Sequence, residues 1–314
     1  MTKAQYQPSG WPVLRTEAPA LGVSGRTLRG AEFRTVFAGV VVHATIPDTI
    51  VVRSRAAVLL APEGAIISHF TAARMWGGRV PDNEWTHVSF MRDVRFRVRG
   101  IKPHRYRRRL DIRKRHGLEV TSPEQTFCDM ARYLGLVDLV ALGDSLVRKK
   151  RFSPEHLVQY AQAWSGQFAS EVVTAARLVR SNVDSSPETA LRVLMVLAGF
   201  PEPEIDIHID EADGTTRYRI DMGYKRARLA IEYDGKWHDT LEQRAKDESR
   251  RTELEVEDDW TFVIVTGDDL YGDTEGLVQR LRAAAREAGV EVPPQPSQAW
   301  RQHFRVVYVS EQAS

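Results

Sequence analysis

The sequence predicts a mixed α/β protein in two parts, and three observations carry this prediction. Between residues 187 and 288 the patterns of apolar residues follow the order helix, three short strands, helix, strand, helix. Upstream, helix patterns alternate with "WTHVSF" (85–90) and "VRFRVRG" (94–100), which alternate as strands do. The charge also changes sign between the parts. Residues 1–183 hold 28 Lys and Arg against 15 Asp and Glu, a net charge of +13, whereas residues 184–314 hold 16 against 27, a net charge of −11. This asymmetry indicates a polyanion-binding part joined to a part with another task.

The composition is that of an ordinary water-soluble protein. The chain of 314 residues is 42% hydrophobic and 27% charged, enough for two domains with their own cores. Cys128 is the only cysteine, so an intramolecular disulfide and a cysteine-based zinc site are excluded, as suits a reducing compartment. The N-terminus lacks the apolar stretch of a signal peptide, and no apolar run approaches the roughly 20 residues of a membrane span. We therefore expect a cytoplasmic protein that does not interact with membranes.

The first 183 residues are expected to form two structural pieces. Residues 1–45 contain a polar leader, a short helix pattern with Ser24 as N-cap and an apolar strand flanked by Gly39. This is either a reduced winged-helix-like unit or a small helix and strand packed on the next domain. Residues 46–183 predict a basic α+β domain. Its expected helices are two around Pro62-Glu63-Gly64 within 52–76, one opened by Ser122 and Pro123, and three at about 136–148, 153–164 and 168–181.

The polar stretch 181–190 marks the expected boundary to a second domain over residues 184–292. Its first helix should begin at Pro187 with Ser186 as cap and stop at Gly199. The strands expected next are "EIDIHI", "TRYRIDMG" and "RLAIEYDG", followed by a charged helix from about Thr240 to Glu257, the strand "TFVIVT" and a helix from about Thr274 to Ala288. A tail over residues 293–314 holds one more possible edge strand, "FRVVYV".

Three carboxylates stand on two of these strands, where Asp is disfavoured and like charges repel. Few residues separate Gly223 from Arg228, so the strands should pair as an antiparallel hairpin that brings Asp221 close to Glu232. Glu232 and Asp234 are two residues apart and should point to the same face. Hard carboxylate oxygens without thiolates suit Mg²⁺ or Mn²⁺, which can polarise a phosphoryl oxygen and activate a bound water. The sequence therefore predicts a divalent-metal site at Asp221, Glu232 and Asp234.

This arrangement resembles the PD-(D/E)xK nucleases. The resemblance rests on a helix bearing Glu188, then Asp221, then Glu232 after an apolar strand start, within an α-β-β-β-α-β order. "LAIEYDGKWH" (229–238) is similar to the branch related to very-short-patch repair endonucleases. Over residues 184–290 the resemblance implies a restriction-endonuclease-like core. It also implies that Asp221 and Glu232 bind the metal, with the Tyr233 carbonyl as a further ligand.

The resemblance also implies roles for the neighbouring residues. Glu188 would contribute from its helix, and His238 would assist as acid, base or leaving-group stabiliser. Asp234 departs from the pattern because it stands where these nucleases usually have lysine; Lys236, two residues later, is a possible substitute.

Simpler interpretations stay open for each residue. An acid such as Glu188 is favoured in a first helical turn anyway, and His238 could cap the following helix. Asp234-Gly235 could be a turn. Asp247 and Arg251 have the i,i+4 spacing of a surface ion pair, which is the interpretation we favour for them.

Residues 92–116 are strongly basic, with 12 Lys and Arg against two Asp. Within this stretch Arg95, Arg97 and Arg99 alternate, which predicts a strand face of three guanidinium groups. We expect this face to follow a phosphate backbone, since a merely solvated face would mix charge signs. The residues expected to bind nucleic acid are Arg95, Arg97, Arg99, Lys102, Arg105, Arg107, Arg108 and Arg109. "TSPEQTFCDMA" (121–131) faintly resembles antitoxins of the AbiE type, which implies DNA rather than RNA as the partner.

Together these features predict a metal-dependent DNA endonuclease that hydrolyses phosphodiester bonds in DNA repair or in defence against foreign DNA. One alternative is a non-catalytic DNA-binding regulator of antitoxin type with a degenerate nuclease domain. A second alternative is an RNA-directed enzyme.

Overall fold

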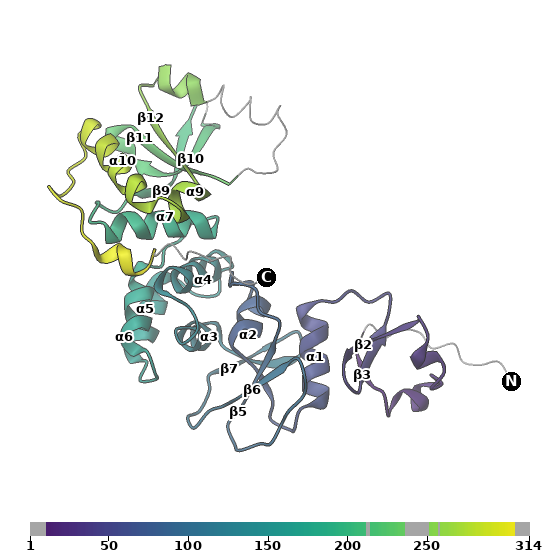
Figure 1. Ribbon diagram of the computed structural model, residues 1–314. Coiled ribbons are helices and arrows are strands. Elements are labelled where there is room, and N and C mark those ends of the chain that lie inside the picture. Colours follow the sequence, from purple (N-terminus) through teal and green to yellow (C-terminus); the bar gives the residue numbers. More distant parts are fainter. Residues whose placement is uncertain (1–10, 212–213, 236–250, 257, 305–314) are drawn as a thin grey trace, which may run out of the picture. The chain divides into compact units, whose positions relative to one another are not determined.

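The computed structural model describes residues 11–211, 214–235, 251–256 and 258–304 (Figure 1). The chain divides into two compact units, one of residues 1–134 and 149–176 and the other of residues 135–148 and 177–314. We call them the N-terminal and the C-terminal unit. Both mix helices with sheets, so the α/β class is confirmed. Within the part of the chain that the structure describes, no helix is both long and apolar enough to cross a bilayer.

The N-terminal unit begins with a small antiparallel sheet in the order β1-β3-β2. Its elements are β1 (Val13–Leu14), two 3-10 helices (Ala18–Leu21 and Thr27–Arg29), β2 (Phe33–Phe37) and β3 (Val40–His43). Gly39 turns the β2–β3 hairpin with a φ of 93°. Ser24 does cap a turn, because its Oγ accepts from Thr27 N (3.1 Å). The helix expected there is only this 3-10 turn, and described residues 11–49 contain no α-helix that could serve as the recognition helix of a winged helix.

The rest of this unit is a five-stranded mixed sheet with helices, in the strand order β6-β5-β4-β8-β7. The strands are β4 (Ile66–Ile67), β5 (Thr86–Phe90), β6 (Ile101–Arg105), β7 (Ile112–Arg115) and β8 (Leu118–Thr121). The helices are α1 (Ile50–Leu60), α2 (His69–Trp76), α3 (Pro123–Met130), α5 (Pro154–Ala163) and α6 (Ala169–Leu178). Ser122 Oγ accepts from Gln125 N (3.0 Å), which confirms the predicted cap of α3.

The prediction of a strand over residues 94–100 is wrong. These residues pair with no strand among the described ones; the next strand, β6, begins only at Ile101 and pairs parallel with β5. The predicted alternation nevertheless holds: Arg95, Arg97 and Arg99 are exposed, and Phe96 packs edge-on against Phe90 at 6.0 Å between ring centroids. Alternating burial arises here from side-chain packing on the sheet edge without a hydrogen-bonded ladder.

The C-terminal unit is a four-stranded sheet in the order β12-β11-β10-β9 with helices on it. Its elements are α4 (Leu136–Arg148), α7 (Ser186–Leu197), β9 (Glu204–Asp210), β10 (Thr216–Tyr224), β11 (Leu229–Asp234), β12 (Thr261–Thr266), α9 (Gly267–Tyr271), α10 (Thr274–Glu287) and two 3-10 helices (Lys225–Ala227 and Ala299–Gln302). The order of strands and helices agrees with the prediction. Of the helix expected over 240–257, residues 251–256 are described and helical. Most of the tail strand expected at "FRVVYV" lies outside the described residues.

Two features of this unit differ in detail from the expectation. The N-cap of α7 is Ser185 rather than Ser186, since Ser185 Oγ accepts from Glu188 N (3.2 Å). The short helix α9 was not predicted; Thr266 and Asp269 form a capping box at its start. Five residues are too few to show a helical period in the sequence.

The two faces of this sheet have separate apolar clusters. Leu191 and Leu194 of α7 and residues of α9 and α10 pack with Met222 and Ile231 on one face. Figure 1 shows these three helices beside the sheet. Ala230 and Ile220 belong to the other cluster, which Leu254 of the helical stretch 251–256 joins. The sheet is therefore held between helices on both faces.

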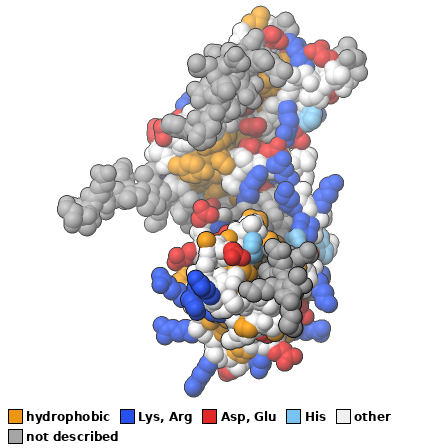
Figure 2. Space-filling model, turned by 90° about the vertical axis from the view of Figure 1, so that its right-hand side faces the viewer, with side chains coloured by type: hydrophobic (Ala, Val, Ile, Leu, Met, Phe, Trp, Pro, Cys, Tyr) orange, Lys and Arg blue, Asp and Glu red, His pale blue; other side chains and the backbone are white. Residues whose placement is uncertain are grey.

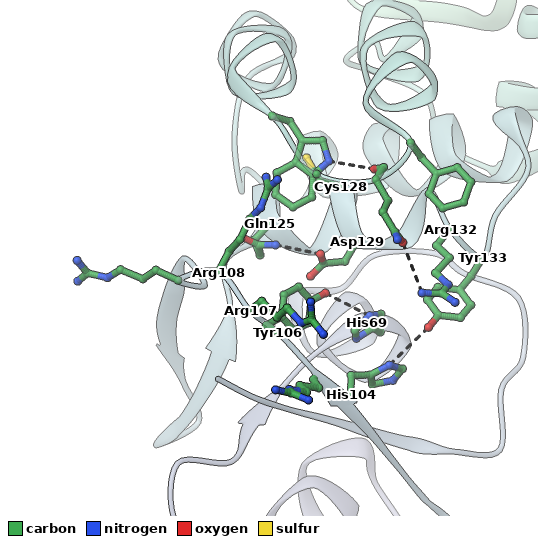
Figure 3. Close-up of a pocket in the computed structure, with 16 residues that line it drawn as sticks. His69, His104, Tyr106, Arg107, Arg108, Gln125, Cys128, Asp129, Arg132 and Tyr133 are labelled. Carbon is green, nitrogen blue, oxygen red and sulfur yellow. Dashed lines mark hydrogen bonds between the residues drawn. The ribbon is translucent and has the colours of Figure 1, made fainter. Parts of the chain in front are cut away.

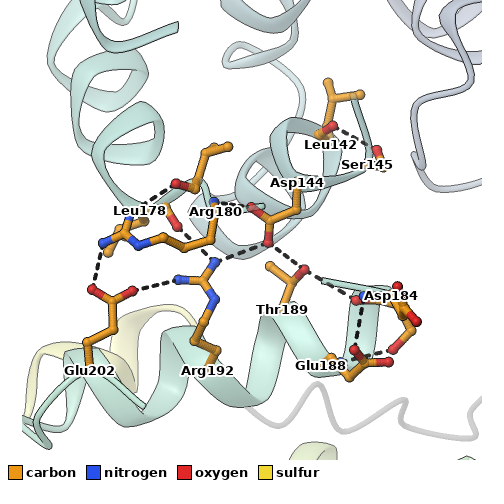
Figure 4. Close-up of polar contacts among 12 residues, drawn as sticks. Leu142, Asp144, Ser145, Leu178, Arg180, Asp184, Glu188, Thr189, Arg192 and Glu202 are labelled. Atoms are coloured by element: carbon orange, nitrogen blue, oxygen red, sulfur yellow. Dashed lines mark hydrogen bonds and ion pairs between the residues drawn. The ribbon is translucent and has the colours of Figure 1, made fainter. Parts of the chain in front are cut away.

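Helix α4 belongs to the C-terminal unit, although the expected domain boundary at residue 183 placed it in the first domain. A buried ion pair joins it to α7: Arg192 Nη2 lies 3.0 Å from Asp144 Oδ2, and the two side chains are 0% and 2% exposed (Figure 4). Arg192 also donates to the Leu178 carbonyl (2.8 Å), and Thr189 Oγ1 donates to Asp144 (2.8 Å). A buried charge needs such partners, so removing either member should destabilise this unit strongly.

Candidate active site

The β10–β11 hairpin brings two of the predicted acids together. The strands are antiparallel and pair Met222 with Ile231. Asp221 precedes Met222 and Glu232 follows Ile231, so the two acids stand next to each other at the same end of this register. The Tyr233 N–H donates to Asp221 Oδ2 (3.1 Å), which fixes the Asp221 carboxylate against β11.

Helix α7 adds Glu188 to this pair. Glu188 lies in the first turn of α7, and its Oε2 accepts from the backbone N–H of Asp184 (3.0 Å), as Figure 4 shows. Burial raises the pKa of Asp221 to about 7, and the negative charges of Glu188 and Glu232 add to this rise. Glu188 thus stabilises the start of its helix and also disfavours a negative charge on Asp221. Its position in the first helical turn, where acids are favoured in any case, therefore accounts for only part of its environment.

Glu232 is balanced by an arginine. Its Oε2 lies 3.4 Å from Arg251 Nη2, and the two side chains are 13% and 26% exposed respectively. The Tyr218 hydroxyl donates to the same oxygen (3.3 Å). Burial, together with Glu232, raises the pKa of Tyr218, so this hydroxyl remains a proton donor at neutral pH.

Arg251 is the residue of this site that the sequence did not reveal. We expected it in a surface pair with Asp247, which lies outside the described residues. Among the described residues, the structure pairs Arg251 with Glu232. "RAKDESRRTE" offers several basic residues at helical spacing, and only the packing of residues 251–256 on the sheet selects Arg251. A cation therefore lies beside the acids although the residue at position 234, where the resembled nucleases have lysine, is acidic.

The other predicted site residues contribute less to the described geometry. Asp234 is the last residue of β11, is exposed, and pairs in parallel register with Thr266 of β12. It shares the strand face of Glu232 because side chains alternate. Lys236 and His238 lie outside the described residues.

The acids do not form a tight cage. Among the described residues, one group of three or more His, Cys, Asp or Glu has ligand atoms that all lie within 4.8 Å of one another, and it consists of His69, His87 and His104 in the N-terminal unit. No sequence motif indicated these histidines, because each comes from a different element. The ligand atoms of the described acids are thus less closely grouped than those of the histidines.

The predicted nucleic-acid surface of the N-terminal unit is exposed. All eight of its predicted residues, from Arg95 to Arg109, are solvent-accessible. Arg105 pairs with Asp93 (2.5 Å), and Arg108 donates to the carbonyl (2.5 Å) and hydroxyl (2.7 Å) of Ser165. On the face drawn in Figure 2, Lys and Arg side chains are spread over several places and do not form one patch. The basic charge is available to a polyanion but is not confined to a single strand face.

Comparison with known proteins adds no family assignment. No protein-family model matches this chain, and no curated protein matches it.

Proposed function

We propose that the C-terminal unit is a divalent-metal-dependent nuclease domain and that DNA is its substrate. The observation that carries the proposal is the convergence of Glu188, Asp221 and Glu232, from a helix and two adjacent strands, around a carboxyl group whose pKa is raised to about 7. Carboxylates crowded in this way cost folding free energy unless a cation offsets their repulsion. Such strained acids are typical of functional sites.

The donor set fits Mg²⁺ or Mn²⁺, with one rearrangement. Asp221 and Glu232 would hold the ion, because hard oxygens at the same end of two paired strands suit these cations. Bound there, the ion would supply Lewis-acid polarisation of a phosphodiester and a water of lowered pKa. Glu232 would exchange its ion pair with Arg251 for the metal. Arg251, at 3.4 Å from Glu232, would then stabilise the negative charge of the phosphate.

The protein's own groups do the positioning. The Tyr233 N–H holds one Asp221 oxygen, leaving the other for the ion. The Tyr218 hydroxyl holds Glu232 Oε2. Proton loss from Asp221 must accompany metal binding, because the protonated carboxyl binds metal poorly.

One observation favours the alternative of a non-catalytic regulator. In the structure Arg251 already neutralises Glu232, and the carboxylates are not gathered as closely as the histidines are. A degenerate site could persist in this paired state while the basic N-terminal unit binds DNA.

Cleavage assays separate the two functions. The full chain is incubated with supercoiled DNA and, separately, with RNA of mixed sequence, in Mg²⁺, in Mn²⁺ and in a chelator. We expect metal-dependent nicking of DNA and none in the chelator. Loss of one metal ligand removes several kcal/mol of transition-state stabilisation, so Asp221→Ala and Glu232→Ala should each slow cleavage by about 10²-fold or more.

The matched control is Glu287→Gln on α10, an exposed acid of the same unit, which should cut like the parent. DNA binding without cleavage by the parent would favour the regulator. Cleavage of RNA alone would favour the RNA-directed enzyme, and parent-like cleavage by both site variants would show that these acids are not the site.

A further inference from the structure

Three histidines meet inside the N-terminal unit, whereas the acids described above belong to the C-terminal unit. His69 is the first residue of α2, His87 lies in β5 and His104 in β6. Within the described residues, their ligand nitrogens all fall within 4.8 Å of one another, and His87 Nδ1 lies 2.9 Å from His104 Nε2. The His104 ring stacks on His69 at 3.8 Å and on His87 at 5.1 Å between centroids.

The hydrogen bonds of His87 fix which of its nitrogens faces the cluster. Asn83 Oδ1 accepts from the Trp85 backbone N–H (3.0 Å), so this atom is an acceptor. His87 Nε2 lies 3.0 Å from the same oxygen and must therefore carry the proton. The remaining nitrogen, His87 Nδ1, has a lone pair, and this lone pair is directed at His104.

The other two rings are also held from outside. His69 Nδ1 contacts Ser68 Oγ at 2.9 Å, and His104 Nδ1 contacts the Tyr133 hydroxyl at 3.5 Å. Each imidazole thus has an oxygen partner that orients it from outside the cluster, and His69 Nε2 additionally lies 3.3 Å from the Tyr106 hydroxyl. Metal-binding histidines show this pattern, because the outer hydrogen bond orients the ring and fixes its tautomer.

The backbone at His69 is strained. Its φ is 51°, in the left-handed region that non-glycine residues adopt uncommonly. His69 is also 4% exposed. The fold therefore keeps a buried imidazole in this place against a local conformational cost.

Burial also keeps the rings in the metal-binding form. Desolvation, with the neighbouring rings and cations, lowers the pKa of His104 to about 3, and desolvation with Lys102 and Arg74 lowers that of His87 to about 4. Desolvation likewise puts the pKa of His69 well below its usual value. Burial thus favours the neutral imidazole, and because His87 Nδ1 accepts from His104 Nε2, metal binding would require the His104 proton to move from Nε2 to Nδ1.

We propose that His69, His87 and His104 form a binding site for one transition-metal ion of the Zn²⁺ class. Three neutral imidazoles without thiolates suit this class, and three histidines plus one open position are a common zinc set. Tetrahedral Zn–N bonds of about 2.0 Å require ligand nitrogens roughly 3.3 Å apart. The His87–His104 pair at 2.9 Å needs to open by only a few tenths of an ångström.

The open position has access to a basic pocket. His69, His104 and Tyr106 line a cavity of about 340 Å³ together with Arg107 and Arg132 (Figure 3). The Tyr106 hydroxyl lies 3.3 Å from His69 Nε2, on the pocket side of the ring. A water or a small anion can thus complete the coordination, and the arginines favour the anion.

The experiment measures Zn²⁺ bound to the full chain at pH 7, with excess Mg²⁺ present to occupy the acid site. We expect one Zn²⁺ per chain, and X-ray absorption of this complex should show three imidazole ligands. His69→Asn should weaken binding by at least about 100-fold, since even outer-shell changes cost 10- to 100-fold. Asparagine tolerates positive φ, so this variant keeps the backbone conformation.

The chain offers a matched control. His116 has the same φ of 51° but lies exposed in the β7–β8 turn, so His116→Asn makes the same change at the same conformation outside the cluster. It should bind Zn²⁺ like the parent, as should the acid-site variant Asp221→Asn. Absence of stoichiometric Zn²⁺ in the parent, an absorption spectrum without imidazole ligands, or equal binding by His69→Asn would each overturn the proposal. The spectrum of the parent decides the matter even if His69→Asn fails to fold.

Discussion

The acids of the C-terminal unit and the histidines of the N-terminal unit are both groups of buried or half-buried side chains of types that can bind metals, but burial acts on their pKa values in opposite directions. It raises the pKa of Asp221 to about 7 and lowers those of His87 and His104 to about 4 and 3. In each case the neutral form is favoured. Neutral imidazole is the ligand form, whereas neutral carboxyl is not. The neutral histidine rings can therefore lie close together, whereas the ligand atoms of the described acids are less closely grouped and Glu232 pairs with Arg251.

The first prediction tests whether the acids and the histidines act as two independent sites. Asp221→Asn should lower Mg²⁺-dependent DNA cleavage by about 10²-fold or more and leave Zn²⁺ stoichiometry unchanged. His69→Asn should weaken Zn²⁺ binding and leave the number of Mg²⁺-dependent nicks per bound DNA unchanged. Cleavage kinetics and metal analysis on the same preparations measure both. If either variant abolished both properties while remaining folded, the sites would be coupled.

The second prediction concerns the charge of the two units. Because phosphate contacts release counterions, log K for DNA should fall with log salt by about 0.9 per neutralised phosphate. Replacing Arg95, Arg97 and Arg99 by Ala should flatten the slope by about one unit per lost contact and weaken binding similarly for all sequences. Binding titrations at several salt concentrations measure this.

Two comparisons make that test specific. The matched control replaces Lys225, Arg226 and Arg286, three exposed basic residues of the acidic C-terminal unit, by Ala. It removes the same total charge, so an equal loss of slope in both triple variants would show a non-specific charge effect. An unchanged slope in the first variant would show that its arginines form only a solvated surface.

The third prediction uses the sign of the Asp221 pKa shift in the metal-free protein. A carboxyl whose pKa rises from about 4 to about 7 on folding stabilises the fold below pH 4 relative to higher pH, and this contribution is lost as pH rises to 7. Asp221→Asn keeps an acceptor for Tyr233 N–H and has no charge to lose. It should match the parent near pH 4 and be more stable by about 1 to 3 kcal/mol at pH 8.

Chemical denaturation in a chelator at the two pH values measures this difference. Glu287→Gln serves again as control and should show no pH-dependent gain. A constant difference between Asp221→Asn and the parent at both pH values would mean that Asp221 is not the titrating group. The histidines have the opposite sign, since their lowered pKa values destabilise the fold as pH falls below about 6.5.

How far the sequence could predict these features depends on how local their causes are. The hairpin and the closeness of Asp221 to Glu232 were predictable because a few turn residues join two strands with alternating patterns. The loop character of residues 94–100 was not, because the same alternation arises without a strand partner. Arg251 and the three histidines depend on tertiary packing: His69, His87 and His104 come from a helix start and two strands, and no spacing rule joins them.

The last prediction, with the smallest expected effect, concerns Asp234 at the open end of the acid site. It is exposed and shares the strand face of Glu232, so water screens its attraction for a cation. If it is a third ligand, Asp234→Asn should raise the Mg²⁺ concentration for half-maximal cleavage several-fold with little change in the maximal rate, because one screened charge contributes about 1 kcal/mol.

Asp268→Asn, at an exposed acid of α9, is the control and should leave the Mg²⁺ requirement unchanged. An unaltered Mg²⁺ requirement in Asp234→Asn would remove this residue from the site. Faster turnover in Asp234→Lys would instead show that position 234 prefers a cation and is degenerate in this chain. Arg251 would then be the residue that supplies the missing positive charge.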